Sequence, residues 1–419
     1  MGDWKEEKLK NFLLIPIRNG LTKPSAIRGN GVKMIGMKEI FAMDQIGSID
    51  MDRVPVNKKE FESSFIQVED LLFARQSLSL EGAGKCSIVV SVKEPTVFES
   101  HLIRLRIDKT KANPYYIYYY FKSSLGKNKI KTLVQQVAAA GIRGKELVEL
   151  SIPSPSIFEQ NRIASILKSL DDKIECNRRI NENLEQQAQA LFKSWFVDFE
   201  PFRDGEFEES ELGMIPQGWK AGTLEDICIQ SSQKVGRRND VKVLSPVTTG
   251  ELVLSENYFT KQVFSESLAK YRVVKKGSFA YNPARVNIGS LGRNEFDFDG
   301  AVSPVYVVFE CKEGYGNYFD LFRKTDKFKS EVLSRAIGGV RQSLNYVDFS
   351  MIQAIIAPKE VVDSFNPLIE NIKALKNHIQ DESLCLAALR DTLLPRLMSG
   401  ELKVQNTDLI NEMLEKGIR

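Results

Sequence analysis

The chain has 419 residues, with 58 Lys and Arg against 55 Asp and Glu for a net charge of +3, and 42% of its residues are hydrophobic. This composition excludes an intrinsically disordered chain, and the lack of an apolar run of about 18 residues excludes a membrane-spanning helix. Five cysteines without paired spacing and only two histidines argue against a disulfide framework, a zinc site or a His-based catalytic triad. We therefore expect a cytoplasmic protein of two to three domains.

The charge is distributed unevenly along the chain. Residues 1–150 carry +7, residues 151–215 carry −6, residues 216–360 carry +4 and residues 361–419 carry −2. Basic segments suit contact with a polyanion such as DNA. The pattern predicts two domains that face a polyanion and two acidic segments with another role.

Residues 1–152 are expected to form a first domain of mixed strands and helices. The β-rich run at 86–90 predicts a strand, and Asn113-Pro114 predicts the start of a helix that continues through Phe121. Tyrosines in this helix could stack on nucleic-acid bases, but packing of the helix on its own sheet is the favoured interpretation. These tyrosines are Tyr115, Tyr116, Tyr118, Tyr119 and Tyr120.

Residues 153–215 are expected to form a long helix and a linker. Apolar residues recur every seven positions, which predicts a helix over about 157–197 with a coiled-coil seam. Ser156 and Glu159 fit a capping box at its start. The residues expected at the helix interface are Ile163, Leu170, Ile174, Leu184, Leu191 and Trp195.

Two features of this segment are not apolar. Asn177 and Asn181 occupy seam positions, where they either fix the pairing register or lie at the wet edge of the seam. The stretch 198–216 is acidic and contains Gly and Pro, which predicts a linker.

Residues 216–357 are expected to form a second mixed domain, with a strand at 305–309. Residues 358–419 then supply a second long helix, over about 361–397, and a tail. Its expected seam residues are Phe365, Ile372, Ile379, Leu386 and Leu393, with a companion row of Leu368, Leu375 and Leu389 that Glu382 breaks.

The ends of the second helix are marked by prolines. Pro358 precedes it, although Asn366-Pro367 could instead be its cap and first residue. Pro395 lacks an amide hydrogen, so we expect the regular helix to stop near Leu394.

The two halves of the chain look like copies of one unit. Trp4 matches Trp219, Phe73-Ala74 matches Phe279-Ala280, and Ala140-Gly141-Ile142-Arg143 matches Gly338-Gly339-Val340-Arg341. The matches occur in the same order along both halves. We therefore predict an α+β fold with a pseudo-twofold repeat, in which two mixed α/β domains are separated by two long antiparallel coiled-coil helices.

Each half carries loops rich in Arg, Gln and Asn, whose side chains can form paired hydrogen bonds to base edges. Glycines beside basic residues would let the backbone approach a phosphate. The candidate DNA-binding residues are Arg75, Gln76, Lys85, Arg143 and Lys145 in the first half, and Tyr281, Asn282, Arg285, Asn287, Arg341 and Gln342 in the second.

A metal-dependent nuclease is the alternative from the enzyme class. Asp299 precedes a predicted strand, and Glu310 and Lys312 follow it, which is loosely the arrangement of a metal nuclease site. An ordinary strand end is the favoured interpretation of these residues.

Several motifs are more specific. They are Pro153-Ser154-Pro155-Ser156-Ile157-Phe158-Glu159-Gln160, Ala190-Leu191-Phe192-Lys193-Ser194-Trp195-Phe196, Ile215-Pro216-Gln217-Gly218-Trp219, Gly339-Val340-Arg341-Gln342-Ser343-Leu344 and Leu394-Pro395-Arg396-Leu397-Met398-Ser399-Gly400-Glu401-Leu402. With them the chain resembles the DNA-specificity (S) subunits of type I restriction–modification systems. One departure is Pro358-Lys359-Glu360, which lacks the Glu-Gln that follows Pro155 in the first half.

The resemblance implies a non-catalytic subunit with two target-recognition domains, 1–152 and 216–357, that read the two parts of a split double-stranded DNA site. It implies that two methyltransferase (M) subunits and restriction (R) subunits are the protein partners. S-adenosylmethionine, ATP and Mg²⁺ would be bound by those partners, and this chain would bind neither metal nor cofactor. A protein-interaction scaffold without a DNA role stays open beside the nuclease alternative.

Overall fold

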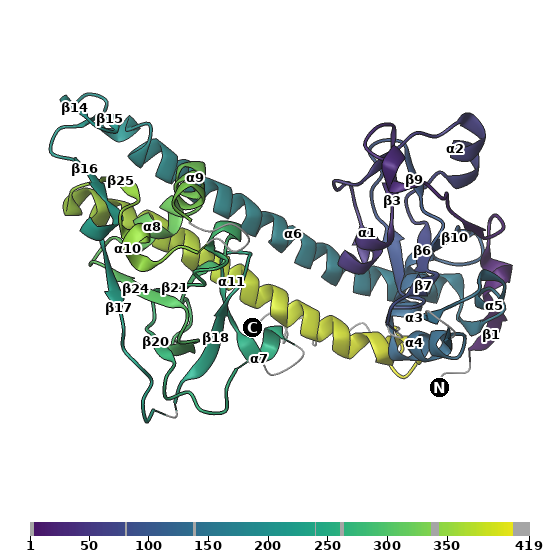
Figure 1. Cartoon of the computed structure of the whole chain (residues 1–419). Helices are drawn as coiled ribbons and strands as arrows, with labels where there is room; N and C mark the ends of the chain where they lie inside the picture. The colour runs from purple at the N-terminus through teal and green to yellow at the C-terminus, as the bar shows by residue number, and fades with distance from the viewer. Residues whose placement is uncertain are drawn as a thin grey trace. The chain divides into compact units, whose positions relative to one another are not determined.

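The computed structural model describes residues 4–79, 82–136, 140–238, 240–259, 264–336 and 343–404. The chain divides into two units: unit 1 holds the chain up to Arg178 and from Ile379 onward, and unit 2 holds Arg179–His378. Both divisions fall inside long helices, so α6 (Ile157–Phe196) and α11 (Lys359–Met398) each contribute a part to either unit (Figure 1).

Unit 1 is built on a five-stranded mixed sheet. Its central strand pairs antiparallel with both neighbours, and the last strand is parallel to the one beside it. The strand order is β2 (Arg18–Asn19), β10 (Leu102–Leu105), β6 (Leu71–Ala74), β8 (Cys86–Val89) and β4 (Gln45–Ile46).

Three smaller sheets and several short helices complete unit 1. The sheets are β5 (Arg53–Val54), β3 (Val32–Ile35) and β9 (Thr96–Phe98); β11 (Gln135–Gln136), β12 (Ala140–Gly141) and β7 (Gln76–Ser77); and β1 (Lys5–Lys8) with β13 (Ser151–Ser154). The helices are α1 (Met37–Ala42), α2 (Lys58–Ser64), α3 (Pro114–Lys122), α4 (Ser124–Lys131), α5 (Gly144–Leu147) and the 3-10 turns η1 (Leu9–Phe12) and η2 (Ser25–Ile27).

Strand β6 shows why the central strands are hydrophobic throughout. Successive side chains of a strand point to opposite faces of the sheet. Leu71 and Phe73 therefore face the core that contains α3 and the long helices, whereas Leu72 and Ala74 face a second core on the other side. Because both faces are covered, all four residues are buried.

Unit 2 contains two four-stranded sheets and two two-stranded sheets. They are β17 (Cys228–Ser231), β24 (Val307–Cys311), β21 (Phe279–Tyr281) and β22 (Leu291–Arg293); β19 (Leu252–Leu254), β18 (Lys242–Pro246), β23 (Gly300–Val302) and β20 (Arg272–Val274); β14 (Phe207–Ser210) with β15 (Gly213–Pro216); and β16 (Lys220–Thr223) with β25 (Gln353–Ile356).

Helices α8 and α10 of unit 2 lie beside its part of α11, and β18 and β20 lie at the opposite end of the unit (Figure 1). The bounds are α7 (Ser255–Tyr258), α8 (Gly316–Phe322), α9 (Asp326–Arg335), α10 (Tyr346–Ser350), η3 (Glu200–Phe202), η4 (Leu224–Asp226) and η5 (Val286–Ile288).

The two units repeat one topology. The sheet order β2-β10-β6-β8 corresponds to β17-β24-β21-β22, the parallel pair β3–β9 corresponds to β18–β23, and β1–β13 corresponds to β16–β25. Single hydrogen bonds recur as well: the Tyr116 hydroxyl donates to the Pro153 carbonyl at 3.0 Å, and the Tyr318 hydroxyl donates to the Ile355 carbonyl at 2.5 Å. Tyr318 and Ile355 each lie 202 positions after their counterparts, so duplication explains both contacts.

The mixed α+β class with two long helices is confirmed. The domain boundaries predicted after residues 152, 215 and 357 stay a prediction, because the division into two units follows the packing and assigns each long helix partly to either unit.

The segment 198–216, which its composition predicts to be a linker, contains regular secondary structure. It forms η3 and the β14–β15 hairpin. Phe199 and Ile215 are buried in the core of unit 2, and the Phe199 ring meets the Trp219 ring edge-on at 5.4 Å. Apolar residues spaced among the acidic ones anchor the hairpin in this core. The average composition of the segment does not reveal their positions.

The prediction that the second helix ends near Leu394 is wrong. Helix α11 begins at Lys359, directly after Pro358, and continues through Pro395 to Met398. Pro367 likewise lies inside the helix, so Asn366 is not its cap. Leu393 and Met398 are fully buried on either side of Pro395, and this packing offsets the missing hydrogen bond.

Candidate nucleic-acid interface

Two loops that are distant in sequence meet in unit 1. The Arg75 carbonyl accepts a hydrogen bond from the Ile142 amide at 2.9 Å, and Gln76 pairs with Gly141 in the β7–β12 ladder. The predicted residues Arg75 and Gln76 therefore lie next to the segment that carries Arg143.

Most polar side chains of this cluster are available to a ligand. Gln76, Arg143 and Lys145 are exposed and Arg75 is half-buried. Arg143 approaches Glu146 at 3.5 Å, and the Arg75 guanidinium forms no hydrogen bond or ion pair with another described residue. Such side chains can contact either a base edge or a phosphate.

Lys85 lies near this cluster but its charge is engaged. Its ammonium group donates to the Phe41 carbonyl at 3.0 Å and lies 3.5 Å from Asp44, which also pairs with Lys122. Burial opposes ionisation of Asp44, but the hydrogen bonds and charges of Lys122 and Lys85 outweigh it and lower its pKa. We assign Lys85 a structural contact, so its predicted role in DNA binding gains no support.

The equivalent loop of unit 2 follows β21. The Leu344 amide donates to the Pro283 carbonyl at 3.1 Å, so this loop too is tied to a segment that is distant in sequence. Arg285 is exposed and makes no side-chain hydrogen bond or ion pair with other residues that the structure describes. Asn282 Oδ1 accepts from the Ala284 amide at 3.0 Å, which stabilises the turn, and Asn287 is half-buried in η5.

Tyr281 is the predicted residue of this loop whose side chain lies in the core. Its side chain is fully buried and stacks on Phe349 with ring centroids 5.1 Å apart. Burial also raises the pKa of its hydroxyl. The prediction that Tyr281 contacts DNA therefore gains no support, because the residue ends a strand whose inner face forms the core. Arg341 and Gln342 lie outside the described residues.

The tyrosines of α3 belong to the core and do not form a stacking platform. All five are buried against the sheet and the long helices, as the favoured interpretation predicted. The Tyr119 hydroxyl donates to Asp171 of α6 at 2.8 Å.

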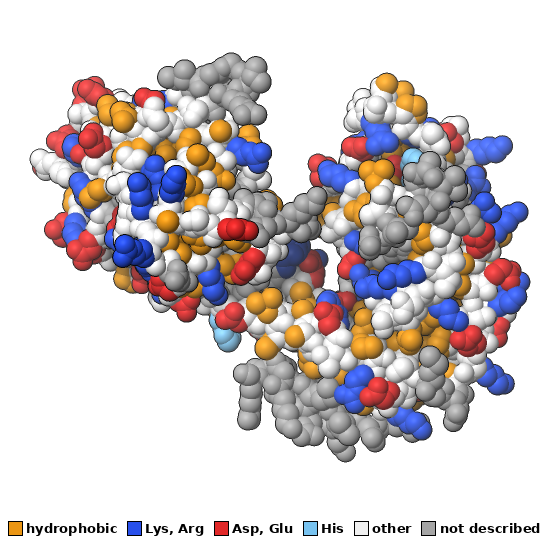
Figure 2. Space-filling model, turned by 60° about the horizontal axis from the view of Figure 1, so that its bottom comes forward, with side chains coloured by type: hydrophobic (Ala, Val, Ile, Leu, Met, Phe, Trp, Pro, Cys, Tyr) orange, Lys and Arg blue, Asp and Glu red, His pale blue; other side chains and the backbone are white. Residues whose placement is uncertain are grey.

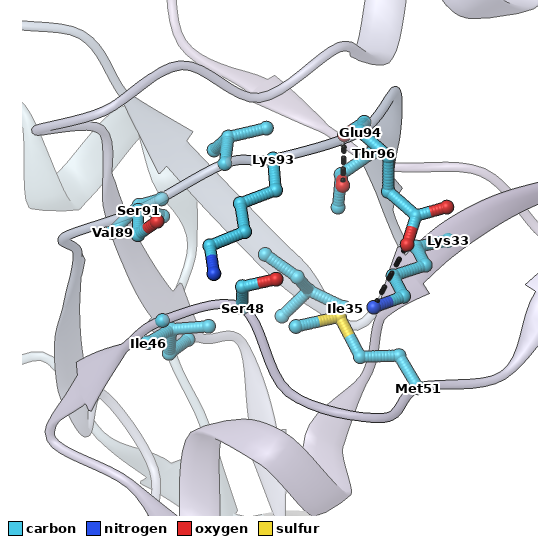
Figure 3. Close-up of a pocket in the computed structure, with 12 residues that line it drawn as sticks. Lys33, Ile35, Ile46, Ser48, Met51, Val89, Ser91, Lys93, Glu94 and Thr96 are labelled. Carbon is cyan, nitrogen blue, oxygen red and sulfur yellow. Dashed lines mark hydrogen bonds and ion pairs between the residues drawn. The ribbon is translucent and has the colours of Figure 1, made fainter.

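A pocket in unit 1 lies away from the candidate loops. In Figure 3 Lys93 extends across it toward Ser48, and Lys33 pairs with Glu94 at 3.0 Å on the opposite side. Ile35 and Met51 also line the pocket. None of the predicted site residues lines this pocket, so it is not part of the candidate interface.

The residues of the nuclease alternative are engaged in separate ion pairs. Asp299 pairs with Arg238 at 3.0 Å, and Glu310 pairs with Lys275 at 2.9 Å. Within the described ranges, no three His, Cys, Asp or Glu residues are grouped so that they could hold a metal ion. The nuclease alternative therefore gains no support from the geometry.

The two long helices pack on each other in unit 1. Ile163, Leu170 and Leu393 are almost fully buried in one core with Leu386 and, partly buried, Ile174. The start of α6 thus packs with the end of α11, which makes the pair antiparallel.

Asn177 is fully buried in this seam. Its Nδ2 donates to Glu382 at 2.7 Å and to the Ser383 hydroxyl at 3.2 Å. Glu382, the residue that breaks the apolar row, is therefore the partner of Asn177. This contact favours the interpretation that Asn177 fixes the pairing register of the two helices, and not that it lies at a wet edge of the seam. The sequence analysis did not match Asn177 with Glu382.

The helices also pack on each other in unit 2. Phe365, Leu191, Trp195 and Ile372 share one core, with Trp195 and Phe365 ring centroids 5.4 Å apart. Leu184 and Ile379, the latter at the start of the unit 1 part of α11, are also buried. Two members of the predicted companion row are not buried: Leu368 is 40% exposed and Leu375 is 45% exposed. These two leucines form an exposed apolar strip on α11 because the seam is narrower than the heptad count predicts.

Charge on the surface is mixed. Figure 2 shows Lys and Arg side chains spread over the visible face of each unit, interspersed with Asp and Glu. Among the residues that the structure describes, no helix is both long and apolar enough to cross a membrane.

Comparison with known proteins identifies relatives of the chain. The family model of the type I restriction modification DNA specificity domain matches residues 1–186. The chain is 26% identical over 424 residues to the type I restriction enzyme MjaIX specificity subunit of Methanocaldococcus jannaschii, which covers 96% of this chain and 94% of that protein. It is 27% identical over 334 residues to the type I restriction enzyme HindI specificity subunit of Haemophilus influenzae, with 60% and 69% covered.

A solved structure has the same fold. The crystal structure of the type I restriction–modification S subunit from M. genitalium superposes with a TM-score of 0.55 at 14% sequence identity, covering 94% of this chain and 96% of that one. The likeness extends over both units and both long helices.

Proposed function

Because the chain belongs to the family of DNA-specificity subunits of type I restriction–modification systems, we propose that it reads a DNA target in two parts, one with each unit. It is a specificity subunit and not a catalytic one. The residues proposed to contact DNA are Arg75, Gln76, Arg143 and Lys145 in unit 1, and Asn282, Arg285 and Asn287 in unit 2.

One observation carries this proposal. The loops after β6 and β21 occupy equivalent places in two copies of one topology, and each presents an arginine without a protein partner among the described residues. An unpaired guanidinium can form two hydrogen bonds with a guanine edge. Two copies with different loop sequences would read two different half-sites.

The test uses the chain assembled with its methyltransferase subunits. Arg75→Ala should relax selection in one half-site, and Arg285→Ala should relax it in the other, each by about 1–3 kcal/mol if the arginine contacts a base. Lys59→Ala, an exposed basic position on α2, is the matched control and should leave both half-sites unchanged. Selection from a random DNA library measures the outcome. Equal weakening on all sequences, with a smaller salt dependence, would instead make the arginine a phosphate contact.

The spacing of the half-sites gives a second test. We propose that α6 and α11, which each have 40 residues, set this spacing. Inserting one heptad into both helices adds about 10 Å of helix at 1.5 Å per residue, or about three base pairs at 3.4 Å each. The preferred gap between half-sites should change accordingly, and an unchanged gap would contradict this part of the proposal.

We propose that methyltransferase subunits, two per complex, dock on the long helices. The exposed strip of Leu368 and Leu375 supports this, because apolar side chains on a helix surface suit burial by a partner. Leu368→Glu with Leu375→Glu should weaken assembly, whereas Val347→Glu, at an exposed position on α10, should not. Size-exclusion chromatography of the mixed subunits measures the difference.

The cofactors belong to the partners in this proposal. Methyltransferase subunits would bind S-adenosylmethionine, and restriction subunits would bind ATP and Mg²⁺. The scaffold alternative predicts an assembled complex without sequence preference and with little salt dependence of DNA binding. The nuclease alternative predicts DNA cleavage by this chain alone with Mg²⁺, lost in Glu310→Ala.

A further inference from the structure

Each of the two equivalent loops presents one exposed aliphatic side chain. We propose that Leu78 in unit 1 and Ile288 in unit 2 are apolar contacts to DNA bases, an inference that rests on the proposed function. They would insert at a base step or pack against a thymine methyl group, and so complement the polar contacts of the same loops.

Leu78 has the most exposed large hydrophobic side chain among the described residues. Its relative exposure is 105%, so it is as accessible to solvent as in an extended peptide. It lies on the loop that connects β6 with β8. It directly follows β7, the strand of Gln76 and Ser77 that pairs with β12. The leucine therefore lies next to the polar cluster of Arg75 and Gln76.

Ile288 occupies the corresponding loop between β21 and β22. Its side chain is 56% exposed at the end of η5, three residues after Arg285. The two loops thus share three features: an exposed aliphatic residue, a nearby arginine and the same place in the repeated sheet. Exposed aliphatic residues occur singly on many proteins, but their recurrence in equivalent loops is not explained by packing in either unit.

The described residues of both loops are held by internal contacts. In unit 1 the Ser79 amide donates to the Ser77 hydroxyl at 3.1 Å, and the Gly82 amide donates to the Ser79 hydroxyl at 3.2 Å. A Cβ at Gly82 would collide with the Ser77 side chain, so the base of the loop is closely packed. A loop that is ordered before binding loses less entropy when it contacts DNA.

In unit 2 the turn that presents Ile288 is fixed in a similar way. The Ile288 amide donates to the Arg285 carbonyl at 3.1 Å, and the buried Ser290 hydroxyl donates to the Pro246 carbonyl at 2.8 Å. Gly289 follows with φ +94°, a conformation that directs the chain back into β22.

The surroundings favour DNA over a protein partner. The described sequence neighbours of Leu78 are Gln76, Ser77 and Ser79, and the residues before Ile288 include Arg285 and Asn287, so both aliphatic residues lie among polar ones in the chain. A protein interface of useful affinity needs a larger buried apolar centre. One aliphatic group among Arg, Gln and Asn suits a groove in which base edges, phosphates and methyl groups alternate.

The experiment uses the full chain assembled with its methyltransferase subunits and the target selected for the wild type. Leu78→Ser and Ile288→Ser should each weaken binding about tenfold, because burial of one aliphatic side chain is lost. Leu78→Met and Ile288→Leu, which keep the apolar volume, should bind within about twofold of the wild type. Leu14→Ser and Ile229→Ser change exposed aliphatic residues (58% and 57%) outside the loops, and they should leave binding unchanged.

Two DNA probes identify the kind of contact. A rise in 2-aminopurine fluorescence on binding, lost in the serine variants, indicates insertion at a base step. Loss of affinity when one thymine is replaced by uracil, with no further loss in the serine variant, indicates a methyl contact. Either result supports the proposal.

Other outcomes overturn it. Affinity of the serine variants within twofold of Leu14→Ser would show that these residues do not contact bases, and weakened assembly with the methyltransferase subunits in the absence of DNA would show a protein contact. A wild-type complex that selects no sequence would contradict the proposed function itself, so the two failures are distinguishable.

Discussion

Asp171 on α6 connects three elements of unit 1, and its removal should destabilise that unit strongly. Its carboxylate accepts hydrogen bonds from the Tyr119 hydroxyl of α3 at 2.8 Å and from Gln45 Nε2 of β4 at 2.9 Å. It also pairs with Arg390 of α11 at 2.8 Å. The domain core and both long helices therefore meet at one side chain.

The magnitude follows from burial. The Asp171 side chain is 10% exposed and that of Arg390 is 30% exposed. Removing one member of a buried ion pair costs about 3–5 kcal/mol. Arg390 keeps a second partner, Asp391, at 2.8 Å. We therefore expect Asp171→Ala to lower the free energy of unfolding by about 3 kcal/mol, the lower end of this range. Asp171→Asn keeps the shape and loses the charge, so about 1–2 kcal/mol is expected.

The assay is urea unfolding combined with hydrogen exchange, which reports α3 and α11 separately from unit 2. The variants Asp171→Ala, Arg390→Ala and the double variant form a cycle, in which we expect a coupling free energy above about 1 kcal/mol. Additive effects in this cycle, or a loss below about 1 kcal/mol for Asp171→Ala, would refute the reasoning.

Three further predictions concern single residues. Burial alone would raise the pKa of Asp320, but Arg323 and Lys373 lower it below its usual value of 3.8, so the stability it contributes is present above pH 3.8 and is lost as the pH falls below it. Acid titration of unfolding should accordingly be shallower in Asp320→Asn, and an unchanged slope would contradict this. Gly289→Ala should destabilise unit 2 by about 1–3 kcal/mol in thermal unfolding, because φ is +94° and a Cβ would lie 2.6 Å from a backbone oxygen; a loss below about 0.5 kcal/mol would be inconsistent with that strain. Asn177→Ala should cost about 1–2 kcal/mol in urea, since it removes two hydrogen bonds from a fully buried side chain, and equal stability would show that the polar contact has no net value.

The long helices and the duplicated topology could be predicted from local pattern. Heptad spacing identified Ile163, Leu170, Phe365 and Leu393 as seam residues, because a helix brings every third or fourth residue to one face whatever surrounds it. Ordered matches between the halves indicated the repeat for a similar reason, since both copies need the same apolar positions to form the same core. Composition was a poorer guide at 198–216, where a few aromatic residues outweigh many acidic ones.

The candidate interface depended more on tertiary structure. Sequence pattern singled out Arg75 and Arg285 as residue types suited to DNA, but it also selected Tyr281 and Lys85. Tertiary packing distinguishes the two arginines from the other two residues, because Tyr281 is buried and the ammonium group of Lys85 lies beside Asp44. Sequence pattern could not identify Leu78 as a candidate contact, because a hydrophobic residue is expected to be buried.

What the amino-acid order determined by itself is the set of elements whose formation depends on neighbours in the chain: amphipathic helices, strands and their duplication. Tertiary structure decided which side chains are exposed and which charges lack a partner, because those properties depend on residues far away in sequence. The contact that brings Ile142 to Arg75, 67 positions earlier, is of this kind, as is the burial on both sides of Pro395 that keeps α11 helical to Met398.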